Sequence, residues 1–327
     1  MKTYCKTIIL LLIVLLATGC TAEETTKDND SKLNIYTSIY PIQFAVERIG
    51  GESIHVETVY PPGVDAHSYE PTSKDMTDIA KSDAFIYLGA GMEAFAETAA
   101  DALEKQDISL IEIGVHEELF HVEESDDHQE EHHDHDHNHD HENEEVEHDG
   151  HNHGDHDPHI WIDPLRMIEM ANIIKEELIT LNPSEEAVYN ENFEELKADL
   201  LTLDEQFIQT LQPKANKEII VSHAGFGYWE ERYGLKQIAI NGLSSSSEPS
   251  QKELVDIIDQ AEELELEYII FEQNSSNRVS EIIQSEIGAE SLTIHNLSVL
   301  TDEDITNNED YLSLMKKNIE VLDKATE

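Results

Sequence analysis

Residues 182–213 read NPSEEAVYNENFEELKADLLTLDEQFIQTLQP, and this segment sets the organisation of the whole chain. Asn182 is suited to cap a helix whose first position is Pro183, and Pro213 cannot continue that helix. One apolar stripe recurs between them every three or four residues, the period of a single helix face. The stripe consists of Tyr189, Phe193, Leu196, Leu200, Leu203, Phe207 and Leu211. We predict one helix of about 40 Å over 182–212, long enough to join two lobes as a rigid connector.

Short strand-like runs alternate with helical runs on both sides of this connector, which is typical of βα units and a parallel sheet. In the first half, we expect strands at 33–37, 54–59, 84–88 and 110–113 and helices at 41–50, 72–81 and 94–104. In the second half, we expect strands at 219–222, 237–240, 268–271 and 292–294 and helices at 228–233, 251–263, 276–286 and 308–324. The predicted fold class is therefore α/β, with two similar βα lobes, 33–181 and 213–327, of four parallel strands each.

The N-terminus has the features of an export signal. Two lysines precede an apolar run over 8–16, which is too short to span a bilayer and is typical of a signal peptide. The run leads into Leu16-Ala17-Thr18-Gly19-Cys20, which resembles a bacterial lipobox, in which the cysteine is lipidated and begins the mature protein. We expect a signal peptide over 1–19 and a lipidated tether over 20–32 that holds the protein on the extracytoplasmic face of the cell membrane. Ordinary signal cleavage beside an unmodified cysteine is the alternative.

The composition excludes some partners and some kinds of site. The formal net charge of −51 excludes a nucleic-acid partner, because the phosphates would be repelled. Cys5 leaves with the signal peptide and Cys20 carries the lipid, so disulfides and thiolate metal sites are excluded from the mature domain. Any metal must be held by histidine and carboxylate side chains. We expect the mature chain to be a monomer.

A His-rich, acidic insertion occupies 121–157 in the first lobe. Residues 122–157 contain sixteen Asp or Glu and no Lys or Arg, and such a segment is predicted to be disordered because it cannot bury a core. Its histidines are His128, His132, His133, His135, His137, His139, His141, His148, His151, His153 and His156. Imidazoles interleaved with carboxylates suit Zn²⁺, Cu²⁺ and Ni²⁺. We expect a weak metal collector with several sites, and a solvated loop without function is the alternative.

Three more histidines lie in ordered contexts. They are His67 in YPPGVDAHSYEPT (60–72), His159 in DPHIWIDP (157–164) and His223 in IIVSHAGFGYW (219–229). Ligands of open α/β sheets bind where strands end and loops begin, and all three positions fit that rule. Each is also flanked by Pro, Gly or aromatic residues, so together they predict one metal site. His55 and His295 are interpreted as surface or structural residues.

The segments around these three histidines resemble those of metal-binding solute-binding lipoproteins of ABC transporters, specifically the zinc-uptake branch. The resemblance extends from Leu33 to Leu322 and includes the His-rich insertion. It implies that metal is held in the cleft between the lobes by His67 and His159 of the first lobe and His223 of the second. It also implies a function without enzymatic activity, namely the capture of Zn(II) and its delivery to a membrane permease and the ATPase subunit of that importer.

The resemblance further implies an acidic fourth ligand just before a C-terminal helix that contains a tyrosine. The matching segment is NEDYLSLM (308–315), whose register places Glu309 at the ligand position. Acids in the first turn of a helix also simply complement its dipole, and Glu272 or a water molecule are the alternatives. Asp163 is expected to accept a hydrogen bond from a ligating imidazole and so to fix its orientation.

His223 is the residue that bears on the choice of metal. The manganese branch of the family has a carboxylate at this position, whereas an imidazole favours Zn²⁺, and three histidines with one carboxylate predict a tetrahedral zinc site. A manganese-binding importer component remains one alternative, and a His-rich metal buffer or adhesin is another. A zinc hydrolase is the enzyme alternative, but the sequence has no His-Glu-x-x-His motif and no Ser or Cys nucleophile in a recognisable setting.

Replacing the expected lipid attachment site tests the anchor. Cys20→Ala is expected to release the protein from the membrane, because the lipid would be its only anchor. Fractionation of cells that express wild type, Cys20→Ala or Cys5→Ala measures this, and Cys5→Ala serves as the control because Cys5 leaves with the signal peptide. Recovery of Cys20→Ala in the membrane pellet would contradict the lipobox interpretation.

Overall fold

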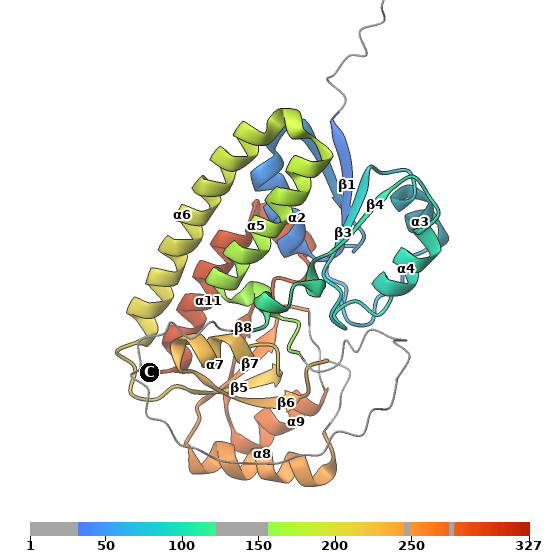
Figure 1. The fold of residues 1–327 in the computed structure, drawn as a ribbon. Helices are drawn as coiled ribbons and strands as arrows, with labels where there is room; N and C mark the ends of the chain where they lie inside the picture. The colour runs from blue at the N-terminus through green and yellow to red at the C-terminus, as the bar shows by residue number, and fades with distance from the viewer. Residues whose placement is uncertain (1–31, 122–155, 245–248, 275–277) are drawn as a thin grey trace, which may run out of the picture. The chain divides into compact units, whose positions relative to one another are not determined.

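Two parallel sheets of identical strand order form the framework of the protein (Figure 1). The computed structural model describes residues 32–121, 156–244, 249–274 and 278–327. The first sheet has the order β2-β1-β3-β4, with β1 Leu33–Thr37, β2 Ile54–Thr58, β3 Ala84–Tyr87 and β4 Ser109–Glu112. The second has the order β6-β5-β7-β8, with β5 Glu218–His223, β6 Lys236–Asn241, β7 Tyr268–Glu272 and β8 Glu290–Ile294. The predicted α/β class with two similar four-stranded parallel units is confirmed.

Helix α6, Glu186–Leu211, is the predicted connector between the two sheets. All seven residues of its apolar stripe are buried, as the sequence period requires. The helix contacts α2 (Tyr40–Gly50) and α5 (Pro164–Leu181) from the first half and α11 (Tyr311–Ala325) from the second. Figure 1 shows α5 and α6 running side by side. One helix therefore packs against elements from both halves of the chain.

Helix α5 is a part of the fold that the sequence analysis missed. Its buried residues include Met167, Met170, Ala171, Ile174 and Leu178, whose spacing of i, i+3, i+4, i+7 and i+11 places them on a single helix face. The local start signals are also present, because Pro164 is the first helical residue and the side chain of Asp163 accepts a hydrogen bond from the Leu165 N–H. The remaining helices are α3 Ser73–Ile79, α4 Ala96–Leu103, α7 Gly227–Tyr233, α8 Gln251–Glu263, α9 Arg278–Ile287 and α10 Asp302–Asn307.

Two helix starts differ from the prediction. Asn182 does not cap α6; its side-chain oxygen accepts a hydrogen bond from Ser184 Oγ at 2.6 Å, and a 3₁₀ turn over Pro183–Glu185 leads into the helix. The C-terminal helix does not begin at Asn308, because this residue has a left-handed φ of 54° that ends α10. Asp310 then caps α11 by accepting a hydrogen bond from the Ser313 N–H.

Leu33–Glu327 form one compact unit, whose described residues contain two apolar clusters. Its main cluster joins the first sheet and one face of the second sheet to α2, α5, α6 and α11. A smaller cluster packs the second sheet against α8 and α9, and it contains Ile220, Ile240, Ile257, Ala261, Ile269 and Ile283. None of the described helices is both long enough and apolar enough to cross a membrane.

A chain of ion pairs crosses α5, α6 and α7. Arg232 on α7 donates two hydrogen bonds of 2.7 Å to Asp204 on α6, and it lies 3.5 Å from Asp163 at the start of α5. Arg166 on α5 binds Asp163 at 2.6 Å and Glu231 on α7 at 2.8 Å. Breaking a buried pair leaves an uncompensated charge, which is strongly destabilising. These contacts therefore hold α7, which begins four residues after His223, against the two long helices.

Phe207 provides a test of the packing of α6. Its ring is fully buried and stacks on Tyr233 at 4.9 Å, whereas the neighbouring Ile208 is 38% exposed. Phe207→Ala is expected to lower the free energy of unfolding by about 3–5 kcal/mol, because it leaves a cavity in the core. Ile208→Ala, the control, is expected to change it by about 0.5 kcal/mol or less. Urea unfolding measures both, and equal effects would contradict the assigned faces of the helix.

Candidate metal centre

Three histidines from distant parts of the chain converge on one point. His67 lies in the loop after β2, His159 immediately precedes the 3₁₀ turn that leads into α5, and His223 is the last residue of β5. His159 Nε2 lies 3.2 Å from His67 Nε2 and 3.2 Å from His223 Nε2, and the three ligand atoms all lie within 4.8 Å of one another. His159 and His223 are each 2% exposed, and His67 is partly buried. The structure thus brings together the three histidines that the sequence singled out.

The spacing of the three nitrogens fits a tetrahedral metal ion. With Zn–N bonds of about 2.0–2.1 Å, two nitrogens of a tetrahedral site lie about 3.3–3.4 Å apart. The two Nε2–Nε2 distances of 3.2 Å are close to this value. The donor set is three imidazole nitrogens, which suits zinc better than the oxygen-preferring divalent ions.

Two carboxylates turn the imidazoles toward the centre. Asp157 Oδ1 accepts a hydrogen bond from His159 Nδ1 at 2.7 Å, and Glu272 Oε1 accepts one from His223 Nδ1. A carboxylate can only accept here, so each Nδ1 carries the proton and each Nε2 presents a lone pair. Lone pairs that face one another at this distance are stabilised by a cation between them. The arrangement therefore suits a metal ion, which would lie between the Nε2 atoms.

Glu272 is itself held in a buried network. Ser222 Oγ donates to Glu272 Oε1 at 2.8 Å, and Asn296 Nδ2 donates to Glu272 Oε2 at 2.6 Å. Gly225 closes the opposite side of His223, since a Cβ at this glycine would lie 2.5 Å from the imidazole Nε2. The ring of His223 is thus fixed by a carboxylate on one side and by a close backbone approach on the other.

Burial and neighbouring charges shift the pKa values of the groups at the centre in different directions. Burial, together with the neighbouring His159 and His223, lowers the pKa of His67 to about 4, so its imidazole is neutral at neutral pH and able to bind metal. Burial alone would lower the pKa of His223, but the charge of Glu272 and its hydrogen bond outweigh burial and raise it. Burial alone would likewise raise the pKa of Glu272, but His223, Asn296 and Ser222 lower it. Glu272 therefore remains an anion inside the protein.

Asp163 does not have the role that was expected of it. Its carboxylate caps α5 and pairs with Arg166, while Asp157 and Glu272 are the acceptors that orient the imidazoles. Glu272 is the last residue of β7, and the pairing of β5 with β7, Ile220 with Ile269 and Val221 with Ile270, brings its carboxylate to His223 at the end of β5. Sequence reasoning considered Glu272 only as a metal ligand, whereas its contact with the site is through Nδ1 of His223.

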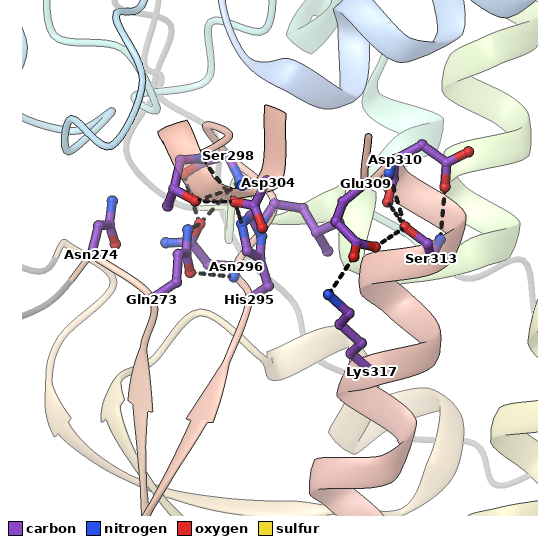
Figure 2. Close-up of polar contacts among 12 residues, drawn as sticks. Gln273, Asn274, His295, Asn296, Ser298, Asp304, Glu309, Asp310, Ser313 and Lys317 are labelled. Atoms are coloured by element: carbon purple, nitrogen blue, oxygen red, sulfur yellow. Dashed lines mark hydrogen bonds and ion pairs between the residues drawn. The ribbon is translucent and has the colours of Figure 1, made fainter. Parts of the chain in front are cut away.

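Glu309 is not brought to the three imidazoles. Figure 2 shows its carboxylate at the start of α11, where it accepts hydrogen bonds from Ser313 Oγ at 2.6 Å and Lys317 Nζ at 2.7 Å. The hydrogen bond from Lys317 lowers the pKa of Glu309. Glu309 as the fourth ligand stays a prediction, and ligation would require release of both contacts.

The other histidines divide into three groups. His55 is exposed beside Glu57, and His295 is buried with its Nε2 on Asp304 at 3.0 Å (Figure 2), consistent with surface and structural roles. Of the eleven histidines named as the metal collector, His156 is described, and its Nε2 lies 3.2 Å from Glu117 Oε2. The ten histidines from His128 to His153 lie outside the described residues, as does Cys20.

The sequence matches a family model described as "Zinc-uptake complex component A periplasmic" over residues 35–325. It is 32% identical over 331 residues to the zinc-binding lipoprotein AdcA of Streptococcus pneumoniae R6, covering 98% of this chain and 61% of the relative. It is 31% identical over 311 residues to the high-affinity zinc uptake system protein ZnuA of Bacillus subtilis, covering 94% of this chain and 93% of the relative. This chain therefore spans about three fifths of the length of the streptococcal AdcA relatives.

Solved structures agree with the sequence matches. The crystal structure of Zn(II)-bound AdcA from Streptococcus pneumoniae has a TM-score of 0.71 at 28% identity and covers 90% of this chain and 58% of that one. A structure of the laminin-binding protein Lmb of Streptococcus agalactiae, titled as bifunctional with adhesin and metal-transporting activity, has a TM-score of 0.73 at 25% identity. It covers 90% of this chain and all of that one.

The role of Glu272 can be tested by a substitution that keeps its shape. Glu272→Gln replaces the anion with a neutral amide, so the hydrogen bond that orients His223 loses its charge. We expect zinc affinity to fall about 10–100-fold, the usual effect of losing such an orienting partner. Competition titration against a chelator of known affinity measures this fall.

Two further Glu→Gln variants complete that experiment. Glu218→Gln is the control, because Glu218 begins the strand that His223 ends and pairs with Lys236. Its zinc affinity is expected to equal that of wild type. Glu309→Gln reports on the fourth position, since a large fall in affinity would place Glu309 on the metal. Wild-type affinity in Glu272→Gln would contradict the orienting role.

Proposed function

The chain belongs to the zinc-uptake complex component A family, and from this membership we propose that it captures Zn(II) outside the cytoplasm and delivers it to the permease of an ABC importer. The observation that carries the proposal is the convergence of three imidazole Nε2 atoms at the spacing of a tetrahedral zinc site. His67 and His159 come from the first half of the chain and His223 from the second. A bound ion would therefore connect both halves, and its release would require that connection to open.

The all-nitrogen donor set supports zinc over manganese as the cargo. Mn²⁺ prefers carboxylate, carbonyl and water oxygens, whereas imidazole suits Zn²⁺. Among the described residues, the buried carboxylate of Glu272 is engaged by His223 Nδ1, Ser222 and Asn296. To gain a carboxylate oxygen, manganese would have to draw Glu272 away from these partners or draw Asp157 away from His159.

We place a water molecule at the fourth coordination position. Glu272 serves the site through the far nitrogen of His223, and Glu309 is bound to Ser313 and Lys317. Both acidic candidates would have to give up charge-assisted hydrogen bonds to reach the metal, and such bonds are about twice as strong as neutral ones. Water requires no such exchange. A donor set that includes one water molecule also suits a carrier, because the carrier must release its ion to the permease.

The anchor and the partners complete the proposal. A lipid on Cys20 would hold the mature chain, as a monomer, at the extracytoplasmic face of the cell membrane, close to a permease and its ATPase subunit. The relatives named as zinc-binding lipoproteins support this placement. The His-rich insertion would act as a weak collector, because imidazole and carboxylate groups bind zinc even without a rigid site.

Two other functions have less support. The adhesin alternative has in its favour the likeness to the laminin-binding protein Lmb, whose title gives that protein an adhesin activity. The hydrolase alternative needs a general base beside an open metal position. Among the described carboxylates near the triad, Asp157 and Glu272 accept hydrogen bonds from imidazole Nδ1 atoms, and Asp65 accepts one from the backbone N–H of His67. We take the chain to be a carrier and not an enzyme.

His223 is the residue that tests the choice of metal. His223→Asp is expected to weaken zinc binding and to narrow the preference for zinc over manganese, because it replaces an imidazole with a harder oxygen donor. Competition titration with both ions measures the two affinities. His55→Asp is the matched control, since His55 is exposed beside Glu57, and it should bind both ions as wild type does. An unchanged zinc affinity in His223→Asp would remove this residue from the site.

A further inference from the structure

A second group of metal-binding side chains lies outside the cleft, where the His-rich insertion leaves and rejoins the fold. Glu117 begins a 3₁₀ turn, Glu117–Leu119, and His121 and His156 flank the residues that the structure does not describe. His156 Nε2 lies 3.2 Å from Glu117 Oε2, and His121 Nε2 lies 3.9 Å from the same oxygen. One ligand atom from each residue lies within 4.8 Å of the other two.

The backbone around this group is fixed to the rest of the protein. Leu119 is fully buried and its carbonyl oxygen accepts a hydrogen bond from Arg166 Nε at 3.1 Å. On the return, the hydroxyl of Tyr228 donates to the carbonyl oxygen of Asp157 at 2.6 Å. Each end of the insertion is therefore anchored within two residues of a histidine of the group.

The ring of His156 is held by aromatic contacts. It stacks on Phe120, a buried residue, with ring centroids 5.1 Å apart and an interplanar angle of 17°. His121 meets His156 edge to face at 5.3 Å. These contacts leave the Nε2 atoms of both imidazoles directed at the carboxylate of Glu117. The ligand ends stay open to solvent, since the side chains of His121 and Glu117 are 65% and 70% exposed.

We propose that Glu117, His121 and His156 form a second metal site, which binds a divalent transition ion such as Zn²⁺ and ties together the two ends of the insertion. Ion pairs between exposed side chains contribute little to stability, so the contacts among these three side chains do little to hold the fold together. Two imidazoles with one carboxylate are a suitable donor set for zinc, copper and nickel. The short edge of 3.2 Å already matches tetrahedral spacing, and the edge of 3.9 Å needs a small closing movement.

The second site differs from the cleft in its expected zinc affinity and in what a bound ion would do to the structure. With three exposed protein ligands, its remaining positions are taken by water, so it should bind zinc more weakly than the buried triad. An ion there would bridge His121 and His156 and so hold the two ends of the insertion together. The proposal uses none of the cleft residues. It rests on the collector role proposed for the insertion and gives His156 two fixed partners, Glu117 and His121, so it stands or fails independently of zinc binding in the cleft.

Calorimetric titration with Zn²⁺ can count the ions if the insertion's own histidines are removed. The protein for this test is the full chain with the ten histidines from His128 to His153 replaced by asparagine, its cleft already loaded with one equivalent of zinc. We expect one further ion to bind. Its binding should shift the imidazole ¹⁵N resonances of His121 and His156 but leave those of His116 in place.

Two variants in that background decide the assignment. His121→Asn with His156→Asn should abolish the second ion while the cleft still retains the first, which also shows that the fold is intact. His116→Asn is the matched control, because this exposed histidine lies on the same segment and faces Glu118 at 3.2 Å; it should leave both ions bound. Failure of the starting protein to take a second ion, or persistence of that ion in the double variant, would overturn the proposal.

Discussion

Two hydrogen bonds between a carboxylate and an imidazole Nδ1 determine what the centre of this protein can do. Asp157 binds His159 in this way, and Glu272 binds His223. Because each Nδ1 carries the proton, the Nε2 atoms of His159 and His223 present lone pairs that face one another at 3.2 Å. Such an arrangement is unfavourable on its own and becomes favourable around a cation. The fold must therefore hold the three rings in place before metal arrives.

Several features of the structure supply that rigidity. His223 and Glu272 end neighbouring parallel strands, so the sheet itself sets their separation. The helix that follows His223 is tied to the two long helices through Arg232, which bonds Asp204 within α6. The hydroxyl of Tyr311 on α11 donates to the carbonyl oxygen of Trp161, two residues after His159. Ligands positioned by such elements need little ordering on binding, and this favours high affinity.

The periodic features were predictable from the sequence, and the side-chain partners were not. The apolar stripe of α6, the strands and the three histidines all follow from spacing and local context. Helix α5 carried the same periodic signal and was overlooked. Asp163 was expected to orient an imidazole because it stands near the His159 motif, whereas Asp157 and Glu272 do the orienting. Glu309 follows from the register of the family resemblance and stays a prediction. For Glu272 the reason is physical, since its contact with His223 arises from the pairing of strands 49 residues apart, which no local pattern encodes.

The most direct test of the central claim is X-ray absorption at the zinc edge of metal-free wild-type protein to which one equivalent of Zn²⁺ has been added. At this ratio the tightest site fills first. The account predicts a four-coordinate ion with three imidazole nitrogens at about 2.0–2.1 Å and one oxygen. A spectrum with one or two imidazoles, or with a six-coordinate shell of oxygens, would show that the converging histidines are not the high-affinity site.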